Sequence, residues 1–203
     1  MLRDADRALL RNNRMADNEY NLDVTGSYNH DIGRSNRVDG APVLYRNGVD
    51  DCLVEGPTEY GYIGVVNAEN VTVRDVTIEN QGNGLHLSNV DDALVENVTL
   101  ANNYEGMRVQ ASDDVTVRDV EANNNTVGVY TRDGQGVRVT DSRLHDNLGG
   151  VVSTHGGNPA QSTATSAPGT IVSDTSISGG YGADCPSRRY RARRHTRPKS
   201  RYH

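Results

Sequence analysis

The chain has 203 residues, of which 34% are hydrophobic, and it contains neither Trp nor Phe. Because an ordinary globular domain is roughly 45–50% apolar when glycine is included, a conventional thick core is not expected. The whole chain carries a formal charge of −6, and residues 187–203 contribute +8, so residues 1–186 carry −14. This acidic, lysine-free body argues against nucleic-acid binding and suggests a halophile-like origin.

Targeting and cross-linking signals are weak. Residues 1–6 have no apolar core, so the sequence predicts no signal peptide. No run of about 18 apolar residues occurs, so no membrane span is expected. The two cysteines, Cys52 and Cys185, lie far apart and predict neither a disulfide framework nor a metal quartet.

Residues 1–61 predict an irregular N-terminal part with partial coils. Residues 9–15 resemble the closing part of a repeat whose beginning is missing. Residues 38–45 include Asp39-Gly40, which indicates a turn followed by a strand. No clear N-terminal cap is visible, although a solenoid usually needs one to cover its open edge.

Residues 62–180 predict a repeat architecture. Successive lines of 22 residues start at Tyr62, Gly84, Gly106, Gly128 and Gly150. The apolar residues of each line form three i, i+2 pairs, which in the first line are Ile63 and Val65, Val71 and Val73, and Val76 and Ile78. Period two and β-branched residues indicate three short strands per line. Coils of this kind bury their inner faces only when they stack about 4.8 Å apart. We therefore predict an all-β fold, a right-handed single-stranded parallel β-helix with about 22 residues per coil.

Polar positions repeat in the same register. The columns are Asp75, Asn97, Asp119 and Asp141; Asn80, Asn102, Asn124 and Asp146; and Asn103, Asn125 and Asn147. Asn tolerates left-handed backbone at turns, and stacked Asn side chains can hydrogen-bond from coil to coil. We interpret these columns as structural.

The period slips after Gly150. It returns with Gly169 matching Gly136 and Ile177 matching Leu144, which implies an insertion of 11 residues near 154–168. The insertion is either a functional loop or a disordered one. Residues 181–203 form a basic tail, interpreted as a disordered extension or, alternatively, as an arm for an anionic partner. Together the two ends suggest a fragment of a longer β-helix protein.

The coil pattern of residues 62–149 resembles the parallel β-helix repeats of NosD-type proteins. Residues 35–45 also resemble a segment of archaeal NosD-like surface proteins, with Ala41 in place of a usual Lys. The resemblance implies an extracellular or cell-envelope location. It also implies either binding or cleavage of polysaccharide, or delivery of copper to nitrous-oxide reductase. Because this repeat class hosts many activities, the resemblance is specific for fold rather than for function.

One outward-facing column supplies the preferred binding residues. Between the inward positions of the first strand, side chains should face solvent and line up on adjacent coils. This places together His86, Arg108, Gln110, Tyr130 and Arg132. Aromatic and cationic groups on a rigid sheet suit sugar rings and their carboxylates or sulfates. We therefore expect a non-catalytic protein that binds polysaccharide or another extended anionic ligand, or that acts as a scaffold.

Two alternatives stay open. Asp92 and Asp114 occupy equivalent turns and are expected about 5 Å apart, which would suit a retaining glycosidase pair or a Ca²⁺ site. A polysaccharide lyase, hydrolase or epimerase would use these turns, but no complete acid–base set is visible. For copper, the candidate ligands form no close motif; they are Met15, Met107, Cys52, Cys185, His30, His86, His145 and His155. No metal site or cofactor is therefore assigned.

Overall fold

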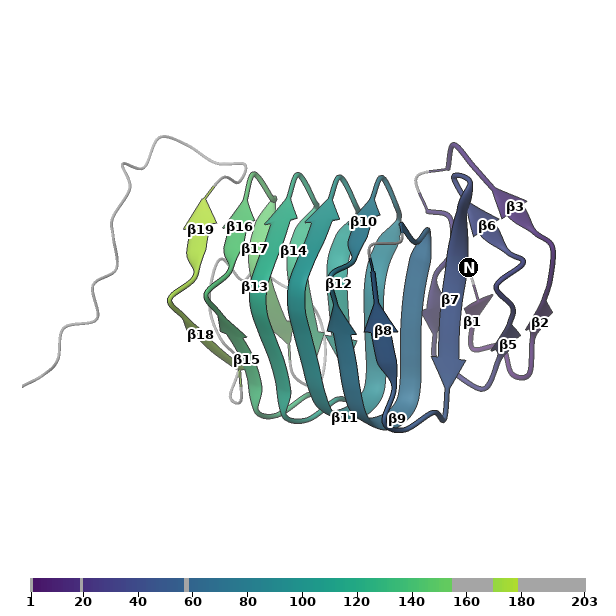
Figure 1. Ribbon diagram of the computed structural model, residues 1–203, viewed down its shortest axis with the longest axis horizontal. Coiled ribbons are helices and arrows are strands. Elements are labelled where there is room, and N and C mark those ends of the chain that lie inside the picture. Colours follow the sequence, from purple (N-terminus) through teal and green to yellow (C-terminus); the bar gives the residue numbers. More distant parts are fainter. Residues whose placement is uncertain (1, 19, 57–58, 155–169, 179–203) are drawn as a thin grey trace, which may run out of the picture.

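The computed structural model describes residues 2–18, 20–56, 59–154 and 170–178. In this part of the chain all regular elements are strands, and they wind into a right-handed parallel β-helix with about 22 residues per coil (Figure 1). The fold class predicted from the sequence is confirmed. The basic tail lies outside the described residues.

Each coil contributes to three stacked sheets, and long strands run around a corner from one sheet to the next. The first sheet contains β7 (Ala41–Asn47), β9 (Tyr62–Arg74), β11 (Asn83–Ala101), β12 (Glu105–Gln110), β14 (Val127–Arg132) and β17 (Gly149–Thr154). The second contains β8 (Leu53–Glu55), parts of β9 and β11, β13 (Val115–Asn123), β15 (Val137–Thr140) and β18 (Thr170–Ser173). The third contains β10 (Thr77–Glu79), parts of β11 and β13, β16 (Arg143–His145) and β19 (Ser176–Ser178).

The strand register reproduces the sequence repeat. Leu85 pairs with Ile63 on one side and Met107 on the other, each 22 positions away. In the last described coil the offset becomes 33, because Val137 pairs with Thr170. The extra eleven residues match the insertion expected from the sequence. The insertion itself lies almost entirely outside the described part.

The interior of the solenoid is filled by aliphatic columns. Ile63, Leu85, Met107 and Val129 are fully buried, directly above one another. The second and third sheets contribute equivalent columns, so one continuous core runs along the axis. Because no coil buries its inner face alone, the core depends on stacking.

The polar columns lie at the corners, where the chain turns from one sheet to the next. Four positions per coil have positive φ, and one such column is Asp75, Asn97, Asp119 and Asp141. Asn and Asp adopt this left-handed conformation at lower cost than other residues with a Cβ. A buried ladder of asparagines lies at the corner between the third sheet and the first, where Asn125 Oδ1 accepts the Asn103 backbone N–H at 2.8 Å. The Asn125 side-chain amide donates to the Leu100 carbonyl at 3.0 Å. The predicted Asn ladder is confirmed.

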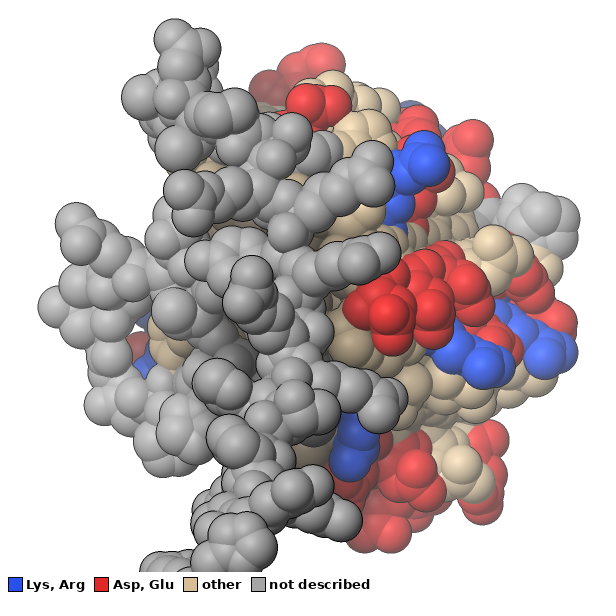
Figure 2. Space-filling model, turned by 90° about the vertical axis from the view of Figure 1, so that its left-hand side faces the viewer, with Lys and Arg blue, Asp and Glu red and all other residues tan. Residues whose placement is uncertain are grey.

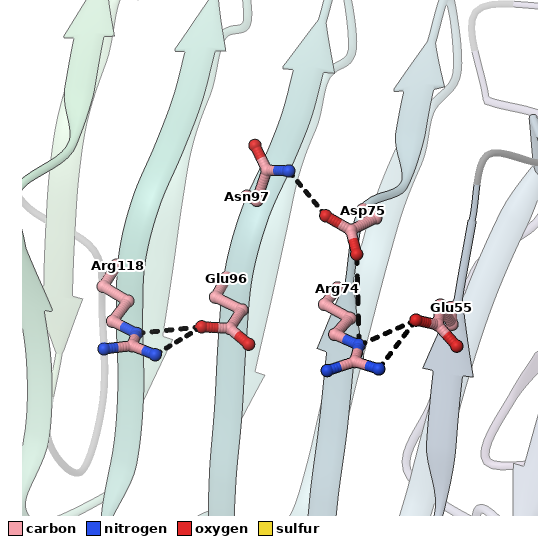
Figure 3. A network of polar contacts seen from close by, with 6 residues as sticks. All are labelled: Glu55, Arg74, Asp75, Glu96, Asn97 and Arg118. Atoms are coloured by element: carbon pink, nitrogen blue, oxygen red, sulfur yellow. Dashed lines mark hydrogen bonds and ion pairs between the residues drawn. The ribbon is translucent and has the colours of Figure 1, made fainter.

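Outward positions of the second sheet carry an alternating column of charges. Glu55, Arg74, Glu96 and Arg118 lie on successive coils, and Asp75 and Asn97 join them (Figure 3). Arg74 Nη2 donates to Glu55 at 2.7 Å, and Arg118 Nε donates to Glu96 at 3.0 Å. These side chains are partly exposed, so each pair contributes little stability.

The N-terminal part forms short coils of its own. Its strands are β1 (Leu2–Arg3), β2 (Leu9–Leu10), β3 (Arg14–Met15), β4 (Val24–Thr25), β5 (Asp31–Ile32) and β6 (Arg37–Val38). The pairs β1–β4, β2–β5 and β3–β6 are parallel, so β1 begins the repeat that seemed to lack its first strand. Asp39 and Gly40 both have positive φ and reverse the chain into β7, as the turn signal predicts.

Candidate functional site

The outer face of the first sheet is divided into a covered part and an open part. Leu22, Val24 and Tyr28, from the N-terminal part, pack against outward residues of the early coils and form a second apolar cluster with them. Beneath this layer Tyr62 and His86 are completely buried. The covered part of the sheet is therefore an internal interface.

His86 does not face solvent, and the prediction that it belongs to an exposed binding column is wrong. Its Nδ1 lies 3.1 Å from the Tyr62 hydroxyl, and the Tyr28 ring meets it edge-on at 5.7 Å between centroids. Burial, and to a lesser extent the charge of Arg108, lowers the pKa of His86 to about 3. His86 is therefore a neutral packing residue at neutral pH.

The open part of the same face is a cleft of about 1170 Å³. Its floor is made of outward and corner positions on adjacent coils, namely Tyr104, Glu105, Arg108, Gln110, Thr126, Val127, Tyr130, Arg132, Leu148, Gly149 and Val152. One wall comes from the N-terminal part, through Arg3, Asp4, Asp23, Thr25 and Gly26. The cleft thus lies between two regions that are far apart in the sequence.

A buried ionic cluster lies where the wall meets the floor. Arg108 Nε and Nη2 donate to the two carboxylate oxygens of Glu105 at 2.6 and 3.0 Å, and Nη1 donates to Asp23 at 3.3 Å. Asp23 also accepts from the Asn83 amide at 2.8 Å. Burial disfavours the charged form of Arg108 and would by itself lower its pKa. The hydrogen bonds and negative charge of Glu105, together with the charge of Asp23, outweigh burial, so the pKa of Arg108 is raised. The guanidinium is permanently charged and held in one orientation.

The remaining predicted binding residues lie in the cleft. Gln110, Tyr130 and Arg132 occupy its floor beside Arg108, so four of the five residues proposed from the sequence lie together there. The Arg108 guanidinium carbon is 5.9 Å from the centroid of the Tyr130 ring. Arg132 is more exposed and bonds at 3.2 Å to Asp133.

Sequence reasoning missed the wall and the acids of the cleft. Asp23 comes from a segment interpreted as irregular, and Glu105 and Tyr104 lie at a corner between repeats. The sequence did contain a signal that this face is covered. The outward positions of the early coils hold large apolar residues, namely Val43, Tyr45, Tyr62 and Val66. Four such residues on one outward face indicate that another segment covers it.

The secondary acidic candidates lie elsewhere. Asp92 and Asp114 are exposed residues of a left-handed corner, at φ of 56° and 53°. They border a shallow depression next to Asn70, Thr72 and Arg118, separate from the cleft. The neighbouring Asp91 accepts the Asp113 backbone N–H at 3.0 Å, so this corner already has a structural role.

The described surface carries clustered charges of both signs. Seen along the axis from the β19 end, acidic clusters alternate with arginines over the described coils (Figure 2). Within residues 2–18, 20–56, 59–154 and 170–178, no group of three or more His, Cys, Asp or Glu residues is placed to hold a metal ion. The same residues include no helix long and apolar enough to cross a membrane.

Comparison with known proteins identifies the family. The model of the right-handed β-helix region matches residues 61–183, and the chain belongs to this family. No curated protein matches the chain. A solved structure from Parabacteroides merdae, described as a candidate glycosyl hydrolase, shares 13% identity over 68% of this chain and 78% of its own, with a TM-score of 0.39.

Proposed function

We propose that the protein binds a carbohydrate, preferably one bearing carboxylates, in the cleft between the N-terminal part and the first sheet. The observation that carries this proposal is the association of Tyr104 and Tyr130 with Arg108, Gln110 and Arg132 in one large cleft. Aromatic rings pack on the apolar faces of sugars, and guanidinium and amide groups hydrogen-bond to hydroxyls and carboxylates. We propose an extracellular or cell-envelope setting, as in the NosD-like proteins that the repeat resembles.

Binding without cleavage is the preferred form of this proposal. Both Glu105 oxygens accept hydrogen bonds from Arg108, which holds this carboxylate in one orientation against the guanidinium. Asp23 accepts from both Arg108 and Asn83 through one oxygen, Oδ1. We infer that the two acids serve to orient the Arg108 guanidinium for a ligand.

The test is calorimetric titration with neutral and carboxylated oligosaccharides. Tyr130→Ala and Arg132→Ala should each weaken binding by roughly tenfold, which corresponds to about 1.4 kcal/mol. Arg138→Ala is the matched control, because Arg138 is an exposed outward residue of the second sheet, away from the cleft. The proposal fails if no saccharide binds, or if the control weakens binding as much as the cleft variants do.

A carbohydrate-active enzyme is the second candidate, and a specific observation favours the cleft over the Asp92 and Asp114 corner. Asp23 and Glu105 flank Arg108 within the cleft, whereas Asp92 and Asp114 are exposed outside it. Turnover of an oligosaccharide that disappears in Glu105→Gln, and persists in Asp114→Asn, would support catalysis in the cleft. Product formation can be followed by chromatography of the reducing sugars.

A further inference from the structure

We propose, on the basis of the carbohydrate-binding role, that the cleft receives the end of a glycan chain rather than its middle. The terminal sugar lies against Arg108, and the rest of the chain runs along the solenoid axis toward β17. The two ends of the cleft are bounded differently.

At the β11 end, no surface continues beyond the cleft. The outward residues that would extend the floor over the preceding coil, His86 and Ser88, are fully buried. The N-terminal layer with Leu22, Val24 and Tyr28 lies over this face. A sugar bound at Arg108 therefore has no room for a further sugar on that side.

The closing wall is fastened to the coils at several points. Asp23 is bonded to Arg108 and Asn83, at 3.3 and 2.8 Å. Tyr20 meets Tyr104 edge-on, with 4.8 Å between ring centroids. Polar contacts and apolar packing combine, so the wall is a fixed part of the site rather than a loosely placed segment.

At the β17 end, the floor continues across further coils and becomes less polar. Its outward column runs from Arg108 through Tyr130 to Val152, with Leu148 and Gly149 beside the last position. Leu148 is 53% exposed and Val152 is partly exposed, so the floor is accessible on this coil. Hydrogen-bonding groups thus concentrate at the closed end, where a terminal sugar offers one hydroxyl more than an internal sugar.

The length of the floor limits how many sugars it contacts. Three coils spaced about 4.8 Å apart span a distance that accommodates about three sugar rings. The affinity should therefore rise with chain length up to about three sugars and then level off. One long chain should bind only one protein molecule per suitable end.

The experiment is calorimetric titration of the full chain with a length series of a carboxylated glycan, from disaccharide to polymer. We expect a plateau in affinity near the trisaccharide and a molar stoichiometry that follows the number of chain ends. Oligosaccharides tagged at the reducing end show which end enters, because a tag there blocks binding only if that end is bound. Polymer binding that follows polymer mass, with many proteins per chain, would overturn end recognition while leaving carbohydrate binding intact. No binding at any length would remove both.

A substitution at the β17 end tests the direction of the glycan chain without relying on the binding stoichiometry. Val152→Trp should weaken binding of trisaccharides and longer chains by about tenfold, and of the disaccharide much less. Thr140→Trp is the matched control, because Thr140 is an outward strand residue of the second sheet. Equal loss for all lengths in Val152→Trp would contradict the proposed direction of the chain.

Discussion

The solenoid interior and the interface beneath the N-terminal part bury side chains in different ways. Inside the coils, aliphatic columns are continuous, and the buried asparagines at the corner have hydrogen-bond partners. Most of the buried polar side-chain atoms that lack a partner within the described residues lie beneath the N-terminal part, on Thr25, Tyr28, His30, His86 and Ser88; the others are on Gln81 and Asn83, at a corner of the coils. The difference follows from repetition, because a contact is satisfied from coil to coil where the same residue repeats, whereas a unique interface is built once. Gln81, which takes the place of Asn in the corner column, leaves its side-chain oxygen without a partner. The interface should therefore open before the coils unfold.

The largest effect is expected from a cavity in the repeated interior. Leu100 is fully buried, and Leu100→Ala should lower the free energy of unfolding by about 3 kcal/mol. Urea denaturation followed by circular dichroism measures this change. Leu53→Ala is the control, because Leu53 is 54% exposed and its truncation should cost about 0.5 kcal/mol or less. Similar losses in the two variants would mean that the interior is not the main source of stability.

A smaller and local effect is expected at the interface. Val24 is fully buried in the N-terminal layer, and Val24→Ala should destabilise the docking of that layer by about 2.5 kcal/mol. Hydrogen exchange should accelerate in residues 20–32 while protection of the coils stays unchanged. Val49→Ala, at a residue that is 41% exposed, serves as the control. Loss of protection throughout the coils would show that the two regions unfold as one unit.

The pH dependence of stability should also originate at the interface. Burial lowers the pKa of His86 to about 3, against an ordinary value of 6.5, so the unfolded chain binds a proton that the folded chain excludes. Above pH 6.5 His86 is neutral in both states and does not reduce the stability of the fold. As the pH falls from 6.5 toward 3, only the unfolded chain takes up the proton, so the fold loses stability. Between pH 7 and pH 5 the loss should reach up to about 2 kcal/mol.

Comparison of the protein with His86→Gln isolates this contribution, since the exposed carboxylates titrate equally in both. The difference in unfolding free energy between them should change with pH in the 5–7 range. A constant difference across that range would show that protonation of His86 is not coupled to folding.

The smallest effect is expected at the outward charge column of the second sheet. Arg118→Ala removes the pair with Glu96, whose partners are partly exposed (Figure 3). The loss should be about 0.5 kcal/mol at low salt and should shrink as added salt screens the charges. Denaturation at two ionic strengths measures it. A loss comparable with that of Leu100→Ala would contradict the view that the interior dominates stability.

Much of the fold was predictable because repetition makes a weak local signal strong. A single Val-x-Val pair does not distinguish a strand from a loop, but the same pair in four successive lines defines the register and the inward face. The Asn and Asp columns were predictable for the same reason, since each corner needs left-handed backbone at a fixed position.

The candidate site was predictable only in part. Arg108, Gln110, Tyr130 and Arg132 follow from the repeat, since outward positions on adjacent coils must lie side by side. His86 belongs to the same column, and the repeat alone places it outside. His86 is buried only because residues 20–32 dock over it. The side chains that make this contact do not belong to the repeat, so the repeat cannot predict it.

By itself the sequence determined the coil length, the inward and outward faces and the left-handed corners, because each depends on contacts between positions one repeat apart. The tertiary structure alone decided which part of the outer face is covered, where the cleft begins and which acids engage Arg108. Asp23 and Arg108 are 85 residues apart, and no periodic signal links them. Their contact arises from the burial of a unique apolar surface, which depends on the shape of both partners rather than on a local pattern.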